Sequence, residues 1–266
     1  MRETWVVTLK NLKFRFREPQ QYLFMFGFPV MFVAMFWFMF RDFPLESSTE
    51  LDIGMFDVFI WGLLGFTTAF ATQSAAVAFS QEKDTGTIKR LLTTPVGSKN
   101  SIFVGFILSE VLVIGMQLVI VFVLAFLALG VYVSSIWALV INFGIYILLS
   151  LVCVGIGLIL AAILNPKLAG QLPMIVVMPI VFLSGSFIPF NSPILYVNPV
   201  FWTQQFALDI GLWGKGLGAT IELTSYMSGG ITDTGIAVGW SIPIMIGFAT
   251  IFLLLGLFLF KKTLQE

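Results

Sequence analysis

The sequence predicts an all-α membrane protein with six transmembrane helices. Hydrophobic residues make up 58% of the 266 residues and charged residues only 11%, which is far from the composition of a soluble globular domain. The apolar residues also form runs of about 20 residues, the length that a helix needs to cross roughly 30 Å of hydrocarbon. The six runs cover residues 21–40, 56–79, 102–130, 137–163, 171–187 and 238–260.

The basic residues predict the orientation of these runs. Of the 14 Lys and Arg residues, all except Arg41 and Lys215 lie before the first run, after the last run, or in the loops on the same side as both ends. Cytoplasmic loops of membrane proteins are enriched in Lys and Arg. We therefore expect a multi-pass protein of the cell membrane, inner or plasma, with both termini in the cytoplasm. The first run is too long for a cleavable signal peptide and lacks a small-residue cleavage site.

Residues 1–18 predict a helix that lies along the inner membrane surface. Basic residues accompany a narrow apolar face at helical spacing, and Glu18-Pro19 disfavours continuation of the helix. This pattern is typical of an interfacial helix, and an unstructured basic tail is the alternative. The apolar face consists of Trp5, Leu9, Leu12 and Phe16.

Residues 81–96 form the largest expected cytoplasmic loop, between the second and third runs. Its first fifteen letters, QEKDTGTIKRLLTTP, carry three basic and two acidic residues. A short helix is expected after Gly86, capped by Thr87 and ended by Pro95. No soluble domain of this chain is expected to cover its apolar side chains, so the loop is either a docking site for another protein or a solvated connector. These side chains are Ile88, Leu91 and Leu92.

The segment 188–237 is expected on the outer side, between the fifth and sixth runs. Its charged residues are only Asp209, Lys215, Glu222 and Asp233. So apolar a segment favours the membrane interface over free extension into water. We expect a short helix over about 198–212 that dips back into the outer leaflet.

Few polar side chains fall inside the apolar runs. Glu110 lies well inside the third run, and an ionisable group in hydrocarbon is expensive enough to be a functional candidate. The alternative is that Glu110 snorkels or accepts a structural hydrogen bond. The uncharged candidates are more typical of hydrogen bonds between helices. The full set for a translocation path is Gln73, Glu110, Gln117 and Asn142. Pro29 and Pro179 predict kinks.

Several functions are excluded by what the sequence lacks. It contains no histidine, and its one cysteine, Cys153, lies in an apolar run, so zinc sites and Cys-His or Ser-His-Asp catalysis are not expected. A net charge of zero gives no electrostatic case for nucleic acid. The nearest string to a phosphate-binding loop, DIGLWGKG from Asp209, lacks the first glycine and the final hydroxyl residue. We therefore expect no enzyme activity and no bound cofactor or metal in this chain.

Three motifs resemble those of a known family. EKDTGTIKRLLTTPV, residues 82–96, resembles the E-x-x-x-G-T-x-x-x-L-x-x-T-P loop of ABC-2 type permeases, the membrane subunits of ATP-binding cassette exporters. REP at 17–19 resembles the element before the first span of that family. LSGSFIPF at 183–190, followed by NPVFW at 198–202, resembles the elements after the fifth span. The motifs occur in the family's order, so the resemblance covers nearly all of residues 1–266 as a single transmembrane domain.

The resemblance implies two kinds of partner. One is a second permease half, identical or similar, and the other is an ATPase subunit that binds ATP and Mg. The loop after the second span would insert into the ATPase through Glu82, Gly86, Thr87, Lys89, Arg90, Leu91, Leu92 and Pro95. The outer segment would form short outer or re-entrant helices, and its gate would be sealed by Ser184, Gly185, Pro189, Asn198 and Pro199.

The function expected from these features is export by an ATP-binding cassette permease. A path lined mostly by apolar side chains favours a hydrophobic or amphipathic substrate, drug-like, lipid-like or glycan-linked, moved by alternating access. A secondary transporter driven by an ion gradient is one alternative, although such proteins typically have more intramembrane carboxylates or broken helices. A membrane anchor or assembly subunit without transport is the other.

Overall fold

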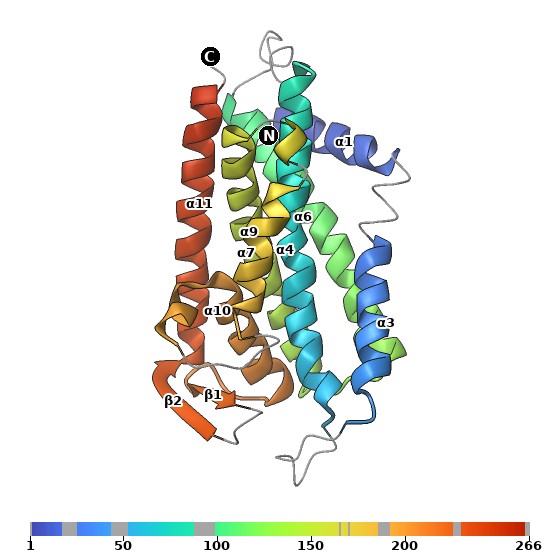
Figure 1. Cartoon of the computed structure of the whole chain (residues 1–266), viewed down its shortest axis with the longest axis vertical. Coiled ribbons are helices and arrows are strands. Elements are labelled where there is room, and N and C mark those ends of the chain that lie inside the picture. The colour runs from blue at the N-terminus through green and yellow to red at the C-terminus, as the bar shows by residue number, and fades with distance from the viewer. Residues whose placement is uncertain are drawn as a thin grey trace.

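The long helices of the chain run side by side in an elongated bundle (Figure 1). They are α4 (Met55–Asp84), α6 (Lys99–Phe122), α7 (Ile136–Ile163) and α11 (Ser241–Thr263), and α6 continues into a π-helical turn, η2 (Val123–Ala128). The computed structural model describes residues 2–17, 26–43, 53–87, 99–164, 166–169, 171–185, 192–225 and 230–263.

Four helices in the described part of the chain are long and apolar enough to cross a membrane. They correspond to the second, third, fourth and sixth runs. The first and fifth runs contain the shorter apolar helices α3 (Phe28–Phe40) and α9 (Leu172–Phe182), and a single turn, α8 (Pro166–Ala169), precedes α9. Pro179 lies inside α9 as expected, whereas Pro29 lies in the first turn of α3. Residues 26 and 27 before α3 are π-helical and residues 18–25 lie outside the described part, so the kink expected from Pro29 stays a prediction.

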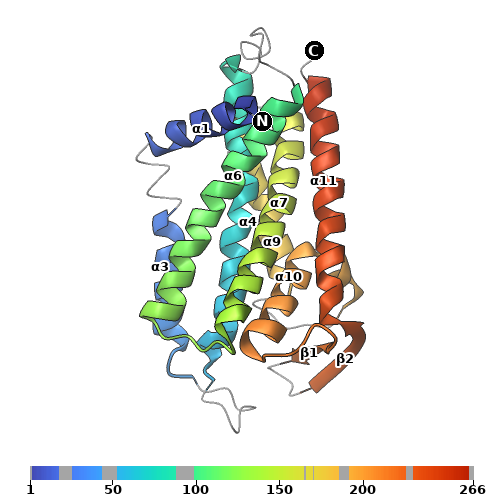
Figure 2. The ribbon, with the colours of Figure 1, turned by 180° about the vertical axis from the view of Figure 1, so that it is seen from behind.

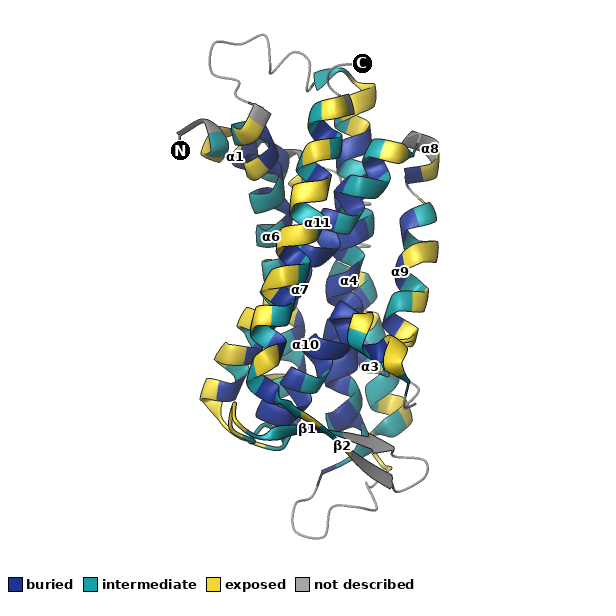
Figure 3. Cartoon of the chain, turned by 90° about the vertical axis from the view of Figure 1, so that its left-hand side faces the viewer, coloured by how far each residue is buried: buried dark blue, intermediate teal, exposed yellow. Residues whose placement is uncertain are grey.

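Helix α4 lies at the centre of the bundle. In its most apolar stretch 78% of the residues are buried, against 17% for α11, and Figure 3 shows the buried residues concentrated along α4 and α7. The two helices approach closely because their contact residues are small. A Cβ added to Gly157 of α7 would collide with the backbone oxygen of Thr72 and lie 3.0 Å from Cβ of Ala75. The small residues of the second run therefore pack within this chain.

Helix α1 (Arg2–Phe16) lies crosswise to the bundle, at the same end as the C terminus (Figures 1 and 2). Its predicted apolar face points outward: Trp5, Leu9 and Phe16 are 40% to 52% exposed. The face that packs on the bundle instead carries Val7 and Thr8. An exposed apolar face on a crosswise helix is the arrangement of a helix that lies in a membrane interface.

The outer segment closes the other end of the bundle (Figure 2). It contains the 3-10 turn η3 (Pro193–Val197), α10 (Pro199–Ala207) and the π-helical η4 (Leu208–Leu212), which occupy the region where a short helix was expected. An antiparallel hairpin follows, formed by β1 (Thr220–Ser225) and β2 (Gly230–Ala237), and η5 (Val238–Trp240) leads into α11. The hairpin departs from the all-α expectation. Its strands are rich in Thr and Ile, which favour extended structure.

Candidate functional site

A partly open cavity of about 550 Å³ lies between helices α1, α3, α4, α6 and α9, and its walls are mostly apolar. Most of its polar side chains come from α1, α4 and α6. This volume is in the range of small-molecule sites in proteins. Its polar lining residues include Lys10, Asn11, Arg15, Gln73, Ser74, Gln81, Glu82, Thr85, Thr87, Glu110 and Gln117.

Helix α1 packs on α6 next to this cavity. A Cβ added to Gly105 of α6 would lie 2.8 Å from the backbone oxygen of Thr4 and 2.9 Å from Cβ of Val7, so only glycine permits this approach. The hydroxyl of Thr8 donates to the Gly105 carbonyl at 3.1 Å, and the Asn11 amide donates to Ser109 at 3.4 Å. The polar face of α1 is therefore fixed by hydrogen bonds to α6.

A buried polar cluster joins three helices at the cavity wall. The Arg15 guanidinium of α1 forms an ion pair with the Glu110 carboxylate of α6, and their side chains are 10% and 1% exposed. Arg15 also donates to the Ser74 hydroxyl of α4 at 2.5 Å, and that hydroxyl donates to the second Glu110 oxygen at 3.0 Å. Both carboxylate oxygens are thus satisfied, as a buried charge requires.

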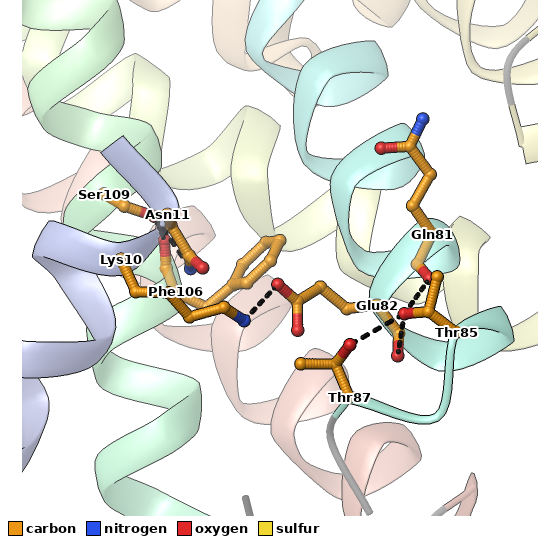
Figure 4. Close-up of polar contacts among 8 residues, drawn as sticks. All are labelled: Lys10, Asn11, Gln81, Glu82, Thr85, Thr87, Phe106 and Ser109. Atoms are coloured by element: carbon orange, nitrogen blue, oxygen red, sulfur yellow. Dashed lines mark hydrogen bonds and ion pairs between the residues drawn. The ribbon is translucent and has the colours of Figure 1, made fainter. Parts of the chain in front are cut away.

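A second ion pair lies where α4 ends. Lys10 of α1 donates to Glu82 of α4 at 2.5 Å, with side chains 36% and 19% exposed. Figure 4 shows this pair beside the last turn of α4, where the Thr85 hydroxyl donates to the Gln81 carbonyl at 2.9 Å and lies 2.8 Å from the Thr87 hydroxyl. The cavity wall therefore includes residues of the last turn of α4 and the residues directly after it.

The expected ATPase-contact loop is described only at its beginning. Helix α4 continues to Asp84, so residues 81–84 are helical. The loop therefore begins later than the sequence predicted, because the helix extends beyond the end of the apolar run. Gly86 ends the helix with a φ of 65°, a backbone conformation that favours glycine. Of the proposed contacts, Glu82, Gly86 and Thr87 are described. Those outside the described residues are Lys89, Arg90, Leu91, Leu92 and Pro95.

The intramembrane polar candidates separate into two groups. Gln73, Glu110 and Gln117 all line the cavity. Asn142 does not; its amide donates to the Ala207 carbonyl of α10 at 3.2 Å, which is the structural alternative for such residues. Lys10 and Arg15 also line the cavity, although the sequence indicated for them only a place in a basic interfacial helix.

The comparison with known families decides the class of the chain. The profile of the family named ABC-2 type transporter matches residues 2–210, which is most of the chain and includes every element from α1 to most of η4. The chain belongs to this family. It is therefore a multi-pass membrane protein and the membrane component of an ATP-binding cassette transporter. No curated protein matches the chain.

The outer-gate candidates of this ABC-2 permease surround the junction between α9 and α10. The Asn198 amide donates to the Ile180 carbonyl of α9 at 2.5 Å, and its oxygen accepts from Val200 N at 2.9 Å, capping α10. Pro199 follows at the start of α10. Ser184 is buried and donates to the Val181 carbonyl at 2.6 Å, and Gly185 has a φ of 80°. Pro189 lies outside the described residues.

The hairpin end of the permease also contains an ion cluster that the sequence did not predict. Lys215 lies 3.0 Å from both the Asp209 carboxylate and the Glu222 carboxylate of β1. Burial raises the pKa of Asp209 from 3.8 to about 6, and the Lys215 hydrogen bond partly opposes this. Burial lowers the pKa of Lys215, but its hydrogen bonds with the two carboxylates outweigh burial and raise it. The cluster ties η4 to the hairpin.

Proposed function

We propose that the chain is a permease subunit that exports a hydrophobic or amphipathic substrate by alternating access. A separate ATPase subunit supplies the energy, binds ATP and Mg, and docks on the segment after α4. A second permease half, identical or similar, completes the transporter. Both termini lie in the cytoplasm, and α3 and α9 cross the membrane together with the residues that flank them.

One observation carries this proposal: the cavity is bounded by the first residues of the expected ATPase-contact segment. Glu82, Thr85 and Thr87 line the cavity together with the deeper Gln73 and Gln117. A displacement of the segment after α4 therefore changes the cavity wall directly. This is the physical link that alternating access requires between a partner's movement and the substrate site.

The ion pairs extend the link to α1. Lys10 binds Glu82 at the end of α4, and Arg15 binds Ser74 and Glu110 on two helices. Helix α1 therefore contacts the end of α4, its middle and the middle of α6. When the end of α4 moves, α1 and the cavity wall move with it.

The arrangement of the ends supports the orientation. Helix α1 and the C-terminal end of α11, which carries Lys261 and Lys262 in its last turn, lie at one end of the bundle, opposite the hairpin (Figure 1). These basic ends suit the cytoplasmic side. Helix α10 then covers the outer end, and Asn198 holds it against α9, which suits a seal of the outer gate.

The test is copurification and ATP hydrolysis with the candidate ATPase, for the native chain and a Gly86→Trp, Leu91→Asp variant. Gly86 has positive φ, so Trp strains the turn, while Asp at position 91 removes an apolar docking side chain. We expect the variant to lose the partner and the hydrolysis that depends on it.

The matched control is a Gly235→Trp, Leu217→Asp variant at the opposite end. Gly235 also has positive φ and open space around its Cβ position, and Leu217 is exposed. We expect this control to keep the ATPase. If a folded Gly86→Trp, Leu91→Asp variant retains the partner and its hydrolysis, docking at this segment is wrong.

A further inference from the structure

The charged side chains that line the described part of the cavity form ion pairs with one another. Arg15 and Glu110 bind each other and share Ser74, and Lys10 binds Glu82. Among the described residues, the four ionisable side chains of the lining thus form two pairs of zero net charge. A ligand with a net charge would have to enter without a counter-charge or break one of these pairs, and both are unfavourable in a site of low polarity.

Gln117 is a polar residue of the lining whose side-chain amide is available for a hydrogen bond to a ligand. Gln117 is 3% exposed and lines the cavity, and among the hydrogen bonds of the described residues none involves its side-chain amide. The Gln117 amide is not among the fully buried side-chain groups that lack a partner in the described part of the chain, so its polar atoms reach the open space of the cavity, where they offer both a donor and an acceptor. It therefore matches an uncharged polar group, such as an amine, hydroxyl or carbonyl.

The rest of the wall suits a ring system or an apolar chain. Phe28 and Phe70 meet edge to face with ring centroids 5.3 Å apart, and both line the cavity with Phe106 and Ile114. Aromatic walls of this kind bind flat apolar groups through large contact areas. The cavity thus combines a mostly apolar enclosure with the side-chain amide of Gln117.

We propose that the cavity selects amphipathic ligands without net charge, and that Gln117 hydrogen bonds to an uncharged polar group of the ligand. This inference rests on the proposed function, because it names the substrate class of the permease. Gln117 is then a specificity-determining residue, and the two ion pairs reject charged analogues of the same shape.

The test uses two dyes that share one skeleton. N-phenyl-1-naphthylamine is uncharged and carries an N–H, whereas 1-anilinonaphthalene-8-sulfonate adds a sulfonate. The full chain in detergent carries Cys153→Ala and Val77→Cys, since Val77 lines the cavity, and the rate of maleimide labelling at position 77 reports occupancy. A matched variant carries Val104→Cys in place of Val77→Cys, since Val104 is exposed on α6 and absent from the cavity lining. Its maleimide labelling rate measures the effect of each dye's partition into the micelle.

We expect the uncharged dye to protect position 77 and not position 104, with the sulfonate requiring at least about tenfold more dye. Adding Gln117→Leu should raise the half-protecting concentration of the uncharged dye about three- to tenfold, as expected for one lost hydrogen bond. Met116→Leu, the exposed neighbour, should leave it unchanged.

Equal or better protection by the sulfonate overturns the inference, as does a lack of protection by the uncharged dye, or a Gln117→Leu variant that binds like the native chain. The assay contains no ATPase. Its failure therefore leaves ATP-driven transport standing, and loss of ATPase docking in the earlier test leaves ligand selection standing.

Discussion

Arg15 of α1 and Glu110 of α6 form a buried ion pair although they are 95 residues apart in the sequence. Ser74 of α4 binds both partners, so three helices meet at one pair of charges on the cavity wall. The pair holds the crosswise helix to the bundle, and it explains why a carboxylate is tolerated in the third apolar run.

Removing one member of this pair should destabilise the protein strongly. In Arg15→Met the Glu110 carboxylate keeps its burial and loses its counter-charge, which costs about 3–5 kcal/mol. The double variant Arg15→Met, Glu110→Leu should recover most of this loss, because no unpaired charge remains. Thermal unfolding in detergent measures both.

The exposed pair Arg41–Asp42 provides the control, with side chains 45% and 82% exposed. Arg41→Met should cost less than about 1 kcal/mol, as other exposed pairs do. A double variant at Arg15 and Glu110 that is as unstable as the single variant would mean that geometry rather than charge compensation governs the cluster.

The close packing of α1 on α6 predicts an effect of a single methyl group. Gly105→Ala places Cβ 2.8 Å from the Thr4 carbonyl oxygen and 2.9 Å from Cβ of Val7, so α1 must shift, at about 1–3 kcal/mol. Gly144→Ala in α7 meets nothing within 4 Å and should stabilise by about 0.5–1 kcal/mol. Melting temperatures of the two variants should therefore move in opposite directions; a shift of the same sign and size argues against this packing.

The cluster of Asp209, Lys215 and Glu222 predicts a dependence of stability on pH. Burial holds the pKa of Asp209 at about 6 in the folded protein against an ordinary value of 3.8, so between these values the folded state binds more protons than the unfolded state. The contribution of Asp209 to the free energy of unfolding therefore falls as pH rises from about 4 to about 6, by about 3 kcal/mol in all.

Asp209→Asn should remove this slope, because the amide does not titrate. Asp233→Asn, an exposed carboxylate on β2, should preserve it. Melting temperatures measured from pH 4 to pH 7 compare the variants, and a slope that survives in Asp209→Asn assigns the dependence to another group.

The sequence predicted the class of the fold because burial in a membrane follows from composition. The runs at 56–79 and 137–163 recur as α4 and α7 with small shifts at their ends. The hairpin of β1 and β2 was missed, since its strands lie in a segment judged by its aromatic and apolar content. Its outer cluster depends on the approach of Lys215 to Asp209 and Glu222, and no spacing rule predicts such a contact.

The candidate site was predicted in part. Glu110, Gln73 and Gln117 stood out because polar groups are rare in apolar runs, and all three line the cavity. Arg15 did not stand out, because a basic residue before a first span is ordinary. The apolar face of α1 was predicted from its spacing, and Trp5 and Leu9 on it are exposed; the face that packs on the bundle was not predicted, and it carries the fully buried Thr8. Hydrophobicity alone does not distinguish a face that contacts lipid from one that contacts protein.

ATP-driven export is tested most directly by uptake of an uncharged amphipathic dye into inside-out membrane vesicles that contain the chain and its candidate ATPase. ATP-driven export predicts uptake that requires ATP and the ATPase, persists when a protonophore collapses the proton gradient, and is lost with the Gly86→Trp, Leu91→Asp variant. Uptake that follows the proton gradient and is indifferent to the ATPase would contradict it and favour a secondary transporter.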